Sequence, residues 1–220
     1  SPNKPNSKRT LPSKVSLSCA IVILLGTACG FIIISGTIPS SIGKLKDMKV
    51  LNLSFNKLTG SIPSSVCELS NLKDLELYMN RFSGELPSKI GDLKQLEILS
   101  LYNNDIYGEI PTSLYTLKSL KILLLNSNKF SGKLNPLVAT LRNLESISLF
   151  DNNFIGQVPF ELEKLKNLKE MNISFNMFSG LVSKDLVQLD AMNMKMINEE
   201  GIAVLLKVAM DRNSAIVSED

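Results

Sequence analysis

The apolar and polar positions of the chain recur with a period of 24 residues over most of its length. Asparagine stands at six positions that are each 24 residues apart, and a glycine follows four residues after each of them. The asparagines are Asn56, Asn80, Asn104, Asn128, Asn152 and Asn176. Because equal spacing over six periods is typical of stacked repeats, the pattern predicts a solenoid in which each period is one structural unit.

Each period contains a short predicted strand that ends just before its asparagine. Two apolar residues alternate with polar ones there, as Leu51 and Leu53 do, and this alternation is typical of a half-buried strand. One strand per repeat in a constant direction predicts a parallel sheet, and the rest of the period supplies the long return path that parallel strands need. On that path, Val66, Leu69 and Leu72 are expected to return apolar side chains to the core.

The turn after each strand has its own recurring residues. Asn56 is expected in this turn, where its side chain can bond backbone groups that the turning chain leaves unpaired. Stacking would place the six asparagines in one structural ladder. Gly60 would allow a backbone angle or a close approach that other residues cannot adopt, and Pro63 would then fix an extended segment.

The residues beside the buried strand positions point to the other side of the sheet, which we call the concave face. Its 24 positions contain no lysine or arginine, but they contain acidic, aromatic and aliphatic side chains. Exposed aromatic and apolar residues in rows suggest anchors for a partner, although cross-strand packing alone would favour the same residues. We predict a protein or peptide partner with basic and apolar groups. The expected contact residues are Asp74, Glu76, Tyr78, Ile98, Tyr102, Ile122, Leu124, Phe150 and Asp151.

Two acceptor sequences for N-linked glycans stand in the same column of the concave face. They are Asn52-Leu-Ser54 and Asn172-Ile-Ser174, in the first and last full strands. If the domain is secreted, Asn52 and Asn172 are candidate glycosylation sites, and glycans there would leave the middle strands free. The alternative is that Asn-x-Ser is a by-product of the repeat pattern.

An apolar run precedes the repeats. Residues 15–34 contain no charge and are about 30 Å long as a helix, which matches the hydrocarbon core of a bilayer. Residues 1–14 form a basic segment without acids and are expected to stay cytoplasmic, which would place the repeats outside the cell. A transmembrane or signal-anchor helix, a cleavable signal peptide and a strand-rich piece of the domain are all compatible with this run.

Gly26 and Gly30 in this run form a GxxxG pair. Such a pair lets two membrane helices approach closely, so a homodimer or a receptor partner through this face is one possible contact.

The repeat frame fails after Met192. Asn198 can cap a short helix whose apolar residues share one face, so residues 192–220 are expected to form a capping helix and tail over the last repeat. A helix of about a dozen residues is too short to span a bilayer.

Composition and charge argue against most chemistry. The chain has no histidine, no tryptophan and only three cysteines, which excludes Ser/His/Asp triads, His-ligated metals and a disulfide-stapled scaffold. Outside residues 1–14, 20 bases face 21 acids, so no basic surface for nucleic acid is expected. Phosphate-binding, dinucleotide, zinc-protease and kinase motifs are missing. We therefore expect no enzyme, no cofactor and no metal site.

The unit LxxLxLxxNxLxGxIPxxLxxLxxL resembles plant-type leucine-rich repeats, as in the ectodomains of receptor-like kinases and receptor-like proteins and in polygalacturonase-inhibiting proteins. GTIP, GSIP, GELP and GEIP stand at Gly36, Gly60, Gly84 and Gly108. The pattern departs at Gly132, which begins GKLNP, and at Gly180, which begins GLVS. The family's usual N-terminal cap is missing, and an apolar run before the repeats is unlike a receptor kinase, in which the span follows them.

The resemblance implies a β-rich α/β solenoid: a right-handed superhelix of 24-residue units with a concave parallel sheet. The repeat domain would cover residues 35–191 in about six and a half repeats, preceded by the apolar helix. It also implies a non-catalytic, membrane-linked recognition module in receptor-type signalling. A secreted inhibitor of a cell-wall-degrading enzyme and a scaffold without a ligand are the alternatives.

Overall fold

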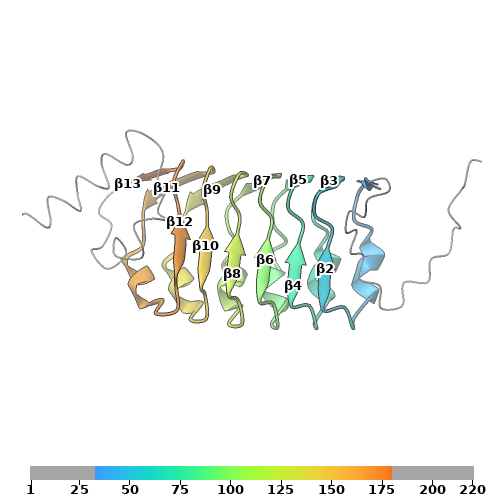
Figure 1. Ribbon diagram of the computed structural model, residues 1–220, viewed down its shortest axis with the longest axis horizontal. Coiled ribbons are helices and arrows are strands. Elements are labelled where there is room, and N and C mark those ends of the chain that lie inside the picture. The colour runs from blue at the N-terminus through green and yellow to red at the C-terminus, as the bar shows by residue number, and fades with distance from the viewer. Residues whose placement is uncertain (1–32, 180–220) are drawn as a thin grey trace, which may run out of the picture.

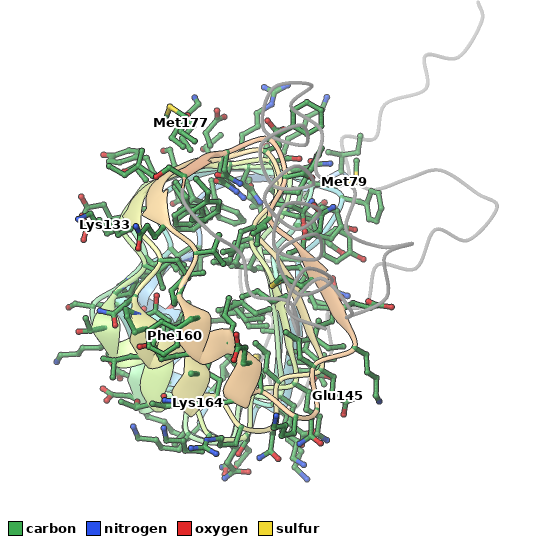
Figure 2. All side chains as sticks on the ribbon, turned by 90° about the vertical axis from the view of Figure 1, so that its left-hand side faces the viewer. Met79, Lys133, Glu145, Phe160, Lys164 and Met177 are labelled. Carbon is green, nitrogen blue, oxygen red and sulfur yellow. The ribbon has the colours of Figure 1, made fainter. Side chains whose placement is uncertain are left out.

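The computed structural model describes residues 33–179, which form one coil of stacked turns (Figure 1). Each turn contributes a strand to one parallel sheet, a strand to a second parallel sheet and a short 3-10 helix. Viewed along the coil, Met79 and Glu145 mark the two ends of the first sheet, Met177 and Lys133 lie at the second sheet, and Phe160 lies with the helices (Figure 2). The predicted β-rich solenoid of stacked turns is confirmed.

The first sheet has six strands in sequence order, and its solvent-facing side is the concave face. Neighbouring strands pair 24 residues apart, so that Val50, Asp74 and Ile98 lie side by side. Every repeat therefore adds one row to this face. The strands are β2 (Val50–Asn52), β4 (Asp74–Glu76), β6 (Ile98–Ser100), β8 (Ile122–Leu124), β10 (Ser146–Ser148) and β12 (Glu170–Asn172).

The second sheet corrects the expectation of one strand per repeat. It has seven strands, six of which follow the turn after a strand of the first sheet, and its neighbours pair 22 residues apart. No strand of this sheet buries more than one apolar residue, for example Phe82 between Arg81 and Ser83, which is too short a pattern to reveal a strand by alternation. The strands are β1 (Ser35–Gly36), β3 (Lys57–Gly60), β5 (Arg81–Gly84), β7 (Asp105–Gly108), β9 (Lys129–Lys133), β11 (Asn153–Gln157) and β13 (Met177–Ser179).

The third side of the coil carries one 3-10 helix per turn. Four of these helices begin directly after a proline in extended conformation, such as Pro63 at φ −71° and ψ 145°. Fixed φ and the missing N–H of proline suit the residue before a helix start. The helices are η1 (Ser40–Lys44), η2 (Ser64–Glu68), η3 (Ile90–Asp92), η4 (Thr112–Thr116), η5 (Pro136–Thr140) and η6 (Phe160–Lys164).

One continuous apolar core runs through the coil. The return-path residues Val66, Leu69 and Leu72 are completely buried, as the repeat pattern predicts. Beneath the second sheet, the rings of Phe130 and Phe154 lie nearly parallel with centroids 6.3 Å apart, and Phe178 continues the row at 5.9 Å. No single turn encloses its own apolar side chains, so neighbouring turns stabilise one another.

The asparagines form a ladder along the junction of the two sheets. The Oδ1 of Asn128 accepts a hydrogen bond from the backbone N–H of Ile106 at 3.0 Å, and its Nδ2 donates to the carbonyls of Leu101 and Leu125. Asn80, Asn104, Asn152 and Asn176 make the same set of bonds one turn apart. The amide side chains thus satisfy backbone groups that the turns leave unpaired inside the coil.

The N-terminal end of the described coil is less completely covered than its middle. Leu53 is half-buried, whereas the corresponding Leu77 and Leu101 are fully buried. An apolar hollow of about 420 Å³ lies there, lined by Ile38, Leu45 and other apolar residues. Ile34, the last residue of the apolar run, already donates its N–H to Oδ1 of Asn56 at 2.8 Å.

The rest of the apolar run, including Gly26 and Gly30, lies outside the described residues, as do residues 1–14 and the predicted capping helix in 192–220. Among the helices of residues 33–179, none has the length and apolar character needed to cross a bilayer.

Candidate functional site

The concave face displays two side chains per row from the strand and two from the segment that follows it. The turn residues Phe55, Met79, Asn103, Ser127, Asp151 and Phe175 all adopt left-handed backbone conformations with φ between 53° and 56°. This conformation is costly for residues other than glycine, and asparagine or aspartate tolerates it best. The sequence analysis missed this feature, because four of the six positions hold neither residue type nor glycine.

Three aromatic rings form a cluster at the N-terminal end of the face. The rings of Tyr78 and Tyr102 stack with centroids 4.4 Å apart and planes 10° from parallel. Phe55 meets Tyr78 edge to face at 5.2 Å. Burial raises the pKa of Tyr102, and the neighbouring Tyr78 and Glu76 act in the same direction. The three rings therefore form one aromatic cluster in the rows next to Asp74 and Glu76.

Asp74 and Glu76 stand two residues apart on β4, so both side chains project from the concave face. Burial raises the pKa of Asp74, Glu97 adds to that effect, and Lys73 opposes it. Burial also raises the pKa of Glu76, with Asp74 adding to the effect and a hydrogen bond from Asn52 opposing it. Both carboxylates are half-buried, and neither forms an ion pair within residues 33–179.

The carboxylates at the edge of the face are paired instead. Glu97 lies between Lys73 and Lys121, with N···O distances of 3.0 and 2.6 Å, and Lys169 contacts Glu145 at 2.6 Å. Hydrogen bonds from the two lysines lower the pKa of Glu97. These residues occupy one column at the strand starts, each 24 residues from the next. Alternating lysine and glutamate at this spacing could have predicted the ion pairs, but the sequence analysis did not use it.

The middle of the face is apolar. Ile98 and Ile122 pair directly across β6 and β8, and Leu124 pairs with Ser100. All three aliphatic side chains are half-buried. Ser100 shares this face but is only 3% exposed, and its Oγ has no hydrogen-bond partner among the described residues.

A second aromatic pair lies at the C-terminal end. The rings of Phe150 and Phe175 meet edge to face with centroids 5.0 Å apart. Asp151 is exposed in the turn beside them. The row of Asn126 and Ser127 separates this pair from the tyrosines, so the predicted aromatic column is divided into two groups.

The two predicted glycosylation sites lie at opposite ends of the sheet. Oδ1 of Asn52 accepts hydrogen bonds from the backbone N–H and the hydroxyl of Ser54, at 3.0 and 2.6 Å. Asn172 and Ser174 repeat this turn at 3.2 and 2.6 Å. Both asparagines are half-buried on the concave face.

The described residues hold no group of three or more histidine, cysteine or acidic side chains placed to bind a metal ion. Cys67 is buried on the return path, and burial raises the pKa of its thiol to about 11, which disfavours the reactive thiolate. The arrangement offers surfaces for contact, with flat rings, unpaired carboxylates and an apolar floor.

Two family models match the chain. Residues 72–204 match the model described as Leucine-rich repeat region, and residues 47–69 match the Leucine Rich Repeat model. The first match alone covers more than half of the chain. No curated protein matches the chain significantly.

Solved structures of plant receptor ectodomains resemble the chain. One is the ectodomain of the receptor kinase GASSHO1/SCHENGEN3 from Arabidopsis thaliana with CASPARIAN STRIP INTEGRITY FACTOR 2, at 35% identity and a TM-score of 0.67; the match covers 68% of this chain and 18% of that one. Another is the Arabidopsis receptor kinase HAESA with the peptide hormone IDA and the co-receptor SERK1, at 36% identity and a TM-score of 0.67. That match covers 68% of this chain and 25% of the HAESA chain. The chain thus spans a quarter or less of either ectodomain.

A plant ice-binding protein is similar over a larger share of its own length. Identity is 25% and the TM-score 0.59, and the match covers 76% of this chain and 71% of that one. Coils of this kind therefore serve more than one purpose, and the side chains on the surface must decide between them.

Proposed function

This chain belongs to the plant-type leucine-rich repeat family, and from that premise we propose that it is a non-catalytic recognition module. Its concave face binds a protein or peptide outside the cell, in receptor-type signalling. The carrying observation is the composition of that face, which holds an aromatic cluster at each end, an apolar floor between them, and two carboxylates that have no ion pair within residues 33–179.

The physical chemistry of the face supports binding of a peptide. Aromatic rings supply large rigid contact areas, and Tyr and Trp anchors dominate many interfaces. The acids favour basic side chains, while the lack of lysine and arginine at the 24 face positions disfavours phosphate-rich ligands. The peptide hormone IDA bound to the receptor kinase HAESA is consistent with this class of ligand.

The second sheet offers no comparable face. Its outward side chains include Lys57, Arg81, Asp105 and Lys129, so charges interrupt it in four of seven strands. Because charged and uncharged side chains are mixed there, the second sheet gives no specific support for ice binding, the activity in the name of the similar plant protein. Peptide recognition is therefore the better-supported function.

A triple substitution tests the proposal. Tyr78→Ala, Tyr102→Ala and Phe150→Ala remove one ring from each described contact on the concave face. The full chain is used to select binders from a displayed random peptide library, and the affinity of the selected peptides for the variant is then measured. We expect about tenfold weaker binding or a larger loss.

The second sheet provides the matched control. Tyr107→Ala, Ile155→Ala and Met177→Ala remove three exposed apolar side chains from it and should leave binding unchanged. Circular dichroism verifies that both variants fold. Unchanged binding in a folded concave-face variant, or failure to select any peptide, would contradict the proposal.

We propose that residues 15–34 link the module to a membrane, with the repeats outside the cell and with Gly26 and Gly30 available for a helix contact. Intact-mass measurement and membrane fractionation test this proposal. Retention of the segment and co-sedimentation with membranes are expected. Its removal, with the protein in the medium, would instead favour the secreted inhibitor of a cell-wall-degrading enzyme.

Asn52 and Asn172 are the proposed glycan acceptors of the secreted face. Their side chains already form the local turn with the hydroxyl residue of the acceptor sequence. Treatment of plant-expressed protein with a peptide-N-glycosidase should lower its mass and convert the occupied asparagines to aspartate. Masses that do not change would exclude glycans at both positions.

A further inference from the structure

The carboxylates of Asp74 and Glu76 differ from the other acids near the first sheet. Glu97 and Glu145 are held by lysines at 2.6 to 3.0 Å, whereas the pair on β4 has no ion pair within residues 33–179. Each member also lies where burial and a neighbouring acid disfavour its charge. Two partly desolvated negative charges without a cation are a typical feature of a binding site.

The aromatic cluster lies beside this acidic pair. Tyr78 follows Glu76 on the same face, two residues further along the chain, and its ring stacks on Tyr102. A planar cation can lie against the flat side of a tyrosine ring while its N–H groups reach carboxylate oxygens. The acidic pair and the aromatic cluster therefore occupy neighbouring positions on the face.

A third group at this point has unused hydrogen-bonding capacity. Ser100 is the direct neighbour of Glu76 across the sheet and is 3% exposed. Its Oγ lacks a hydrogen-bond partner. Within residues 33–179, the only other buried side-chain oxygens without a hydrogen-bond partner are those of Ser65 and Tyr115, which lie in the 3-10 helices on another side of the coil. Buried hydroxyls are normally paired, so this one indicates a place where a ligand donor is missing.

We propose that Asp74, Glu76, Tyr78 and Ser100 form a subsite for one arginine side chain of the bound peptide. This inference rests on the proposed function and narrows it to a ligand chemistry. The guanidinium donates to the two carboxylates and packs beside the aromatic cluster that contains Tyr78, and the Ser100 hydroxyl accepts from a further N–H.

Arginine fits this geometry better than lysine. A guanidinium carries five N–H donors in a planar fork and loses little hydration, so it can serve two carboxylates and a ring at once. An ammonium is a compact, strongly hydrated charge that cannot lie flat on an aromatic surface. The site should therefore bind arginine more tightly than lysine, and lysine more tightly than a neutral side chain.

Asn52 gives the subsite a rim that a glycan would change. It pairs with Glu76 across the sheet, and its side chain hydrogen-bonds the Glu76 carboxylate. A carbohydrate on Asn52 would stand beside the carboxylates. The test protein is therefore the full chain produced in bacteria, which add no N-linked glycan of this kind.

The experiment uses the peptides selected from the displayed random library. An arginine-containing peptide is synthesised in three forms that carry arginine, lysine or citrulline at that position; citrulline keeps the shape of arginine without its charge. Fluorescence anisotropy measures binding of each form to the wild-type chain, to the variant Asp74→Asn with Glu76→Gln, and to Glu170→Gln. Glu170 occupies the same face column as Asp74 on β12, so its variant is the matched control.

We expect citrulline to weaken binding to the wild-type chain and to Glu170→Gln about tenfold or more, and lysine to weaken it less. The variant at 74 and 76 should bind the arginine and citrulline forms equally. Selected peptides without arginine enrichment, or an equal citrulline effect in all three proteins, would overturn the subsite while leaving peptide binding intact. The comparison of arginine with citrulline on the wild-type chain needs no substitution and so does not depend on how the variants fold.

Discussion

The two sides of the six-stranded sheet follow different rules. On the core side, a leucine, isoleucine or methionine fills each buried strand position, and the ladder of asparagines repeats the same hydrogen bonds from turn to turn. On the concave face, every row differs: tyrosine gives way to asparagine and then to phenylalanine, and aspartate gives way to isoleucine. The repeated side carries the stability of the coil, and the irregular side is free to carry recognition.

A pair of neighbouring residues in β11 tests this division most strongly. Phe154 is fully buried between Phe130 and Phe178, whereas the adjacent Ile155 is 43% exposed. Phe154→Ala should lower the free energy of unfolding by about 3–5 kcal/mol, because it opens a cavity in the ring row. Ile155→Ala should change it by about 0.5 kcal/mol or less. Urea denaturation of both variants measures the difference, and similar losses would refute the division.

The asparagine ladder supplies the second test. Asn128→Ala leaves the N–H of Ile106 without a partner inside the coil and removes one of the two amide hydrogen bonds to the carbonyl of Leu101. We expect a loss of about 1–3 kcal/mol, which is the usual cost of one buried unpaired group. Asn126→Ala, two residues earlier on the concave face, is the control and should be nearly neutral. A neutral Asn128→Ala in the same denaturation assay would contradict the structural role of the ladder.

The acidic pair gives a smaller effect whose sign depends on pH. The pKa values of Asp74 and Glu76 are raised in the folded protein from ordinary values of 3.8 and 4.5. Protonation of these two carboxyl groups therefore stabilises the folded protein. Their contribution to stability is fully present below the ordinary pKa values and is lost as the pH rises through the raised pKa values. Relative to wild type, Asp74→Asn with Glu76→Gln should be more stable at neutral pH. That advantage should vanish on acidification.

Glu97 should give the smallest effect, and with the opposite sign. The lysine partners lower the pKa of Glu97 from 4.5. The ionised carboxylate therefore contributes to stability above pH 4.5, and this contribution is lost as the pH falls through the lowered pKa. Glu97→Gln should reduce stability slightly at neutral pH, because exposed ion pairs contribute little. High salt should remove the difference from wild type through screening. A destabilisation that persists in salt would indicate a role beyond the ion pairs.

The sequence predicts what recurs in it. Strand positions, the asparagine ladder and the buried return path follow from 24-residue spacing, because a stacked turn needs the same side chain at the same place. The second sheet could not be predicted because none of its strands buries more than one apolar residue. The left-handed turns at Phe55 and Phe175 could not be predicted either, since nothing in these residue types signals that conformation.

The arrangement of the concave face depends on neighbours rather than on period. The column of Tyr78, Tyr102 and Phe150 is evident in the sequence, but its division into two clusters depends on Asn126 between them. Burial of Ser100 likewise results from the particular side chains of adjoining rows. Such features differ at every row, so no repeat consensus contains them.

The asparagine amides also determine how the coil would respond to mechanical load. Each inner asparagine holds a backbone N–H from 22 residues earlier and a carbonyl from 27 residues earlier, so its bonds cross the boundary between turns. An inner turn cannot detach without breaking the bonds of both neighbours, whereas a terminal turn breaks only one set. Tension applied to the two ends would thus unfold the coil from its ends in steps of one turn, and the central strands β6 and β8 would be the last to separate.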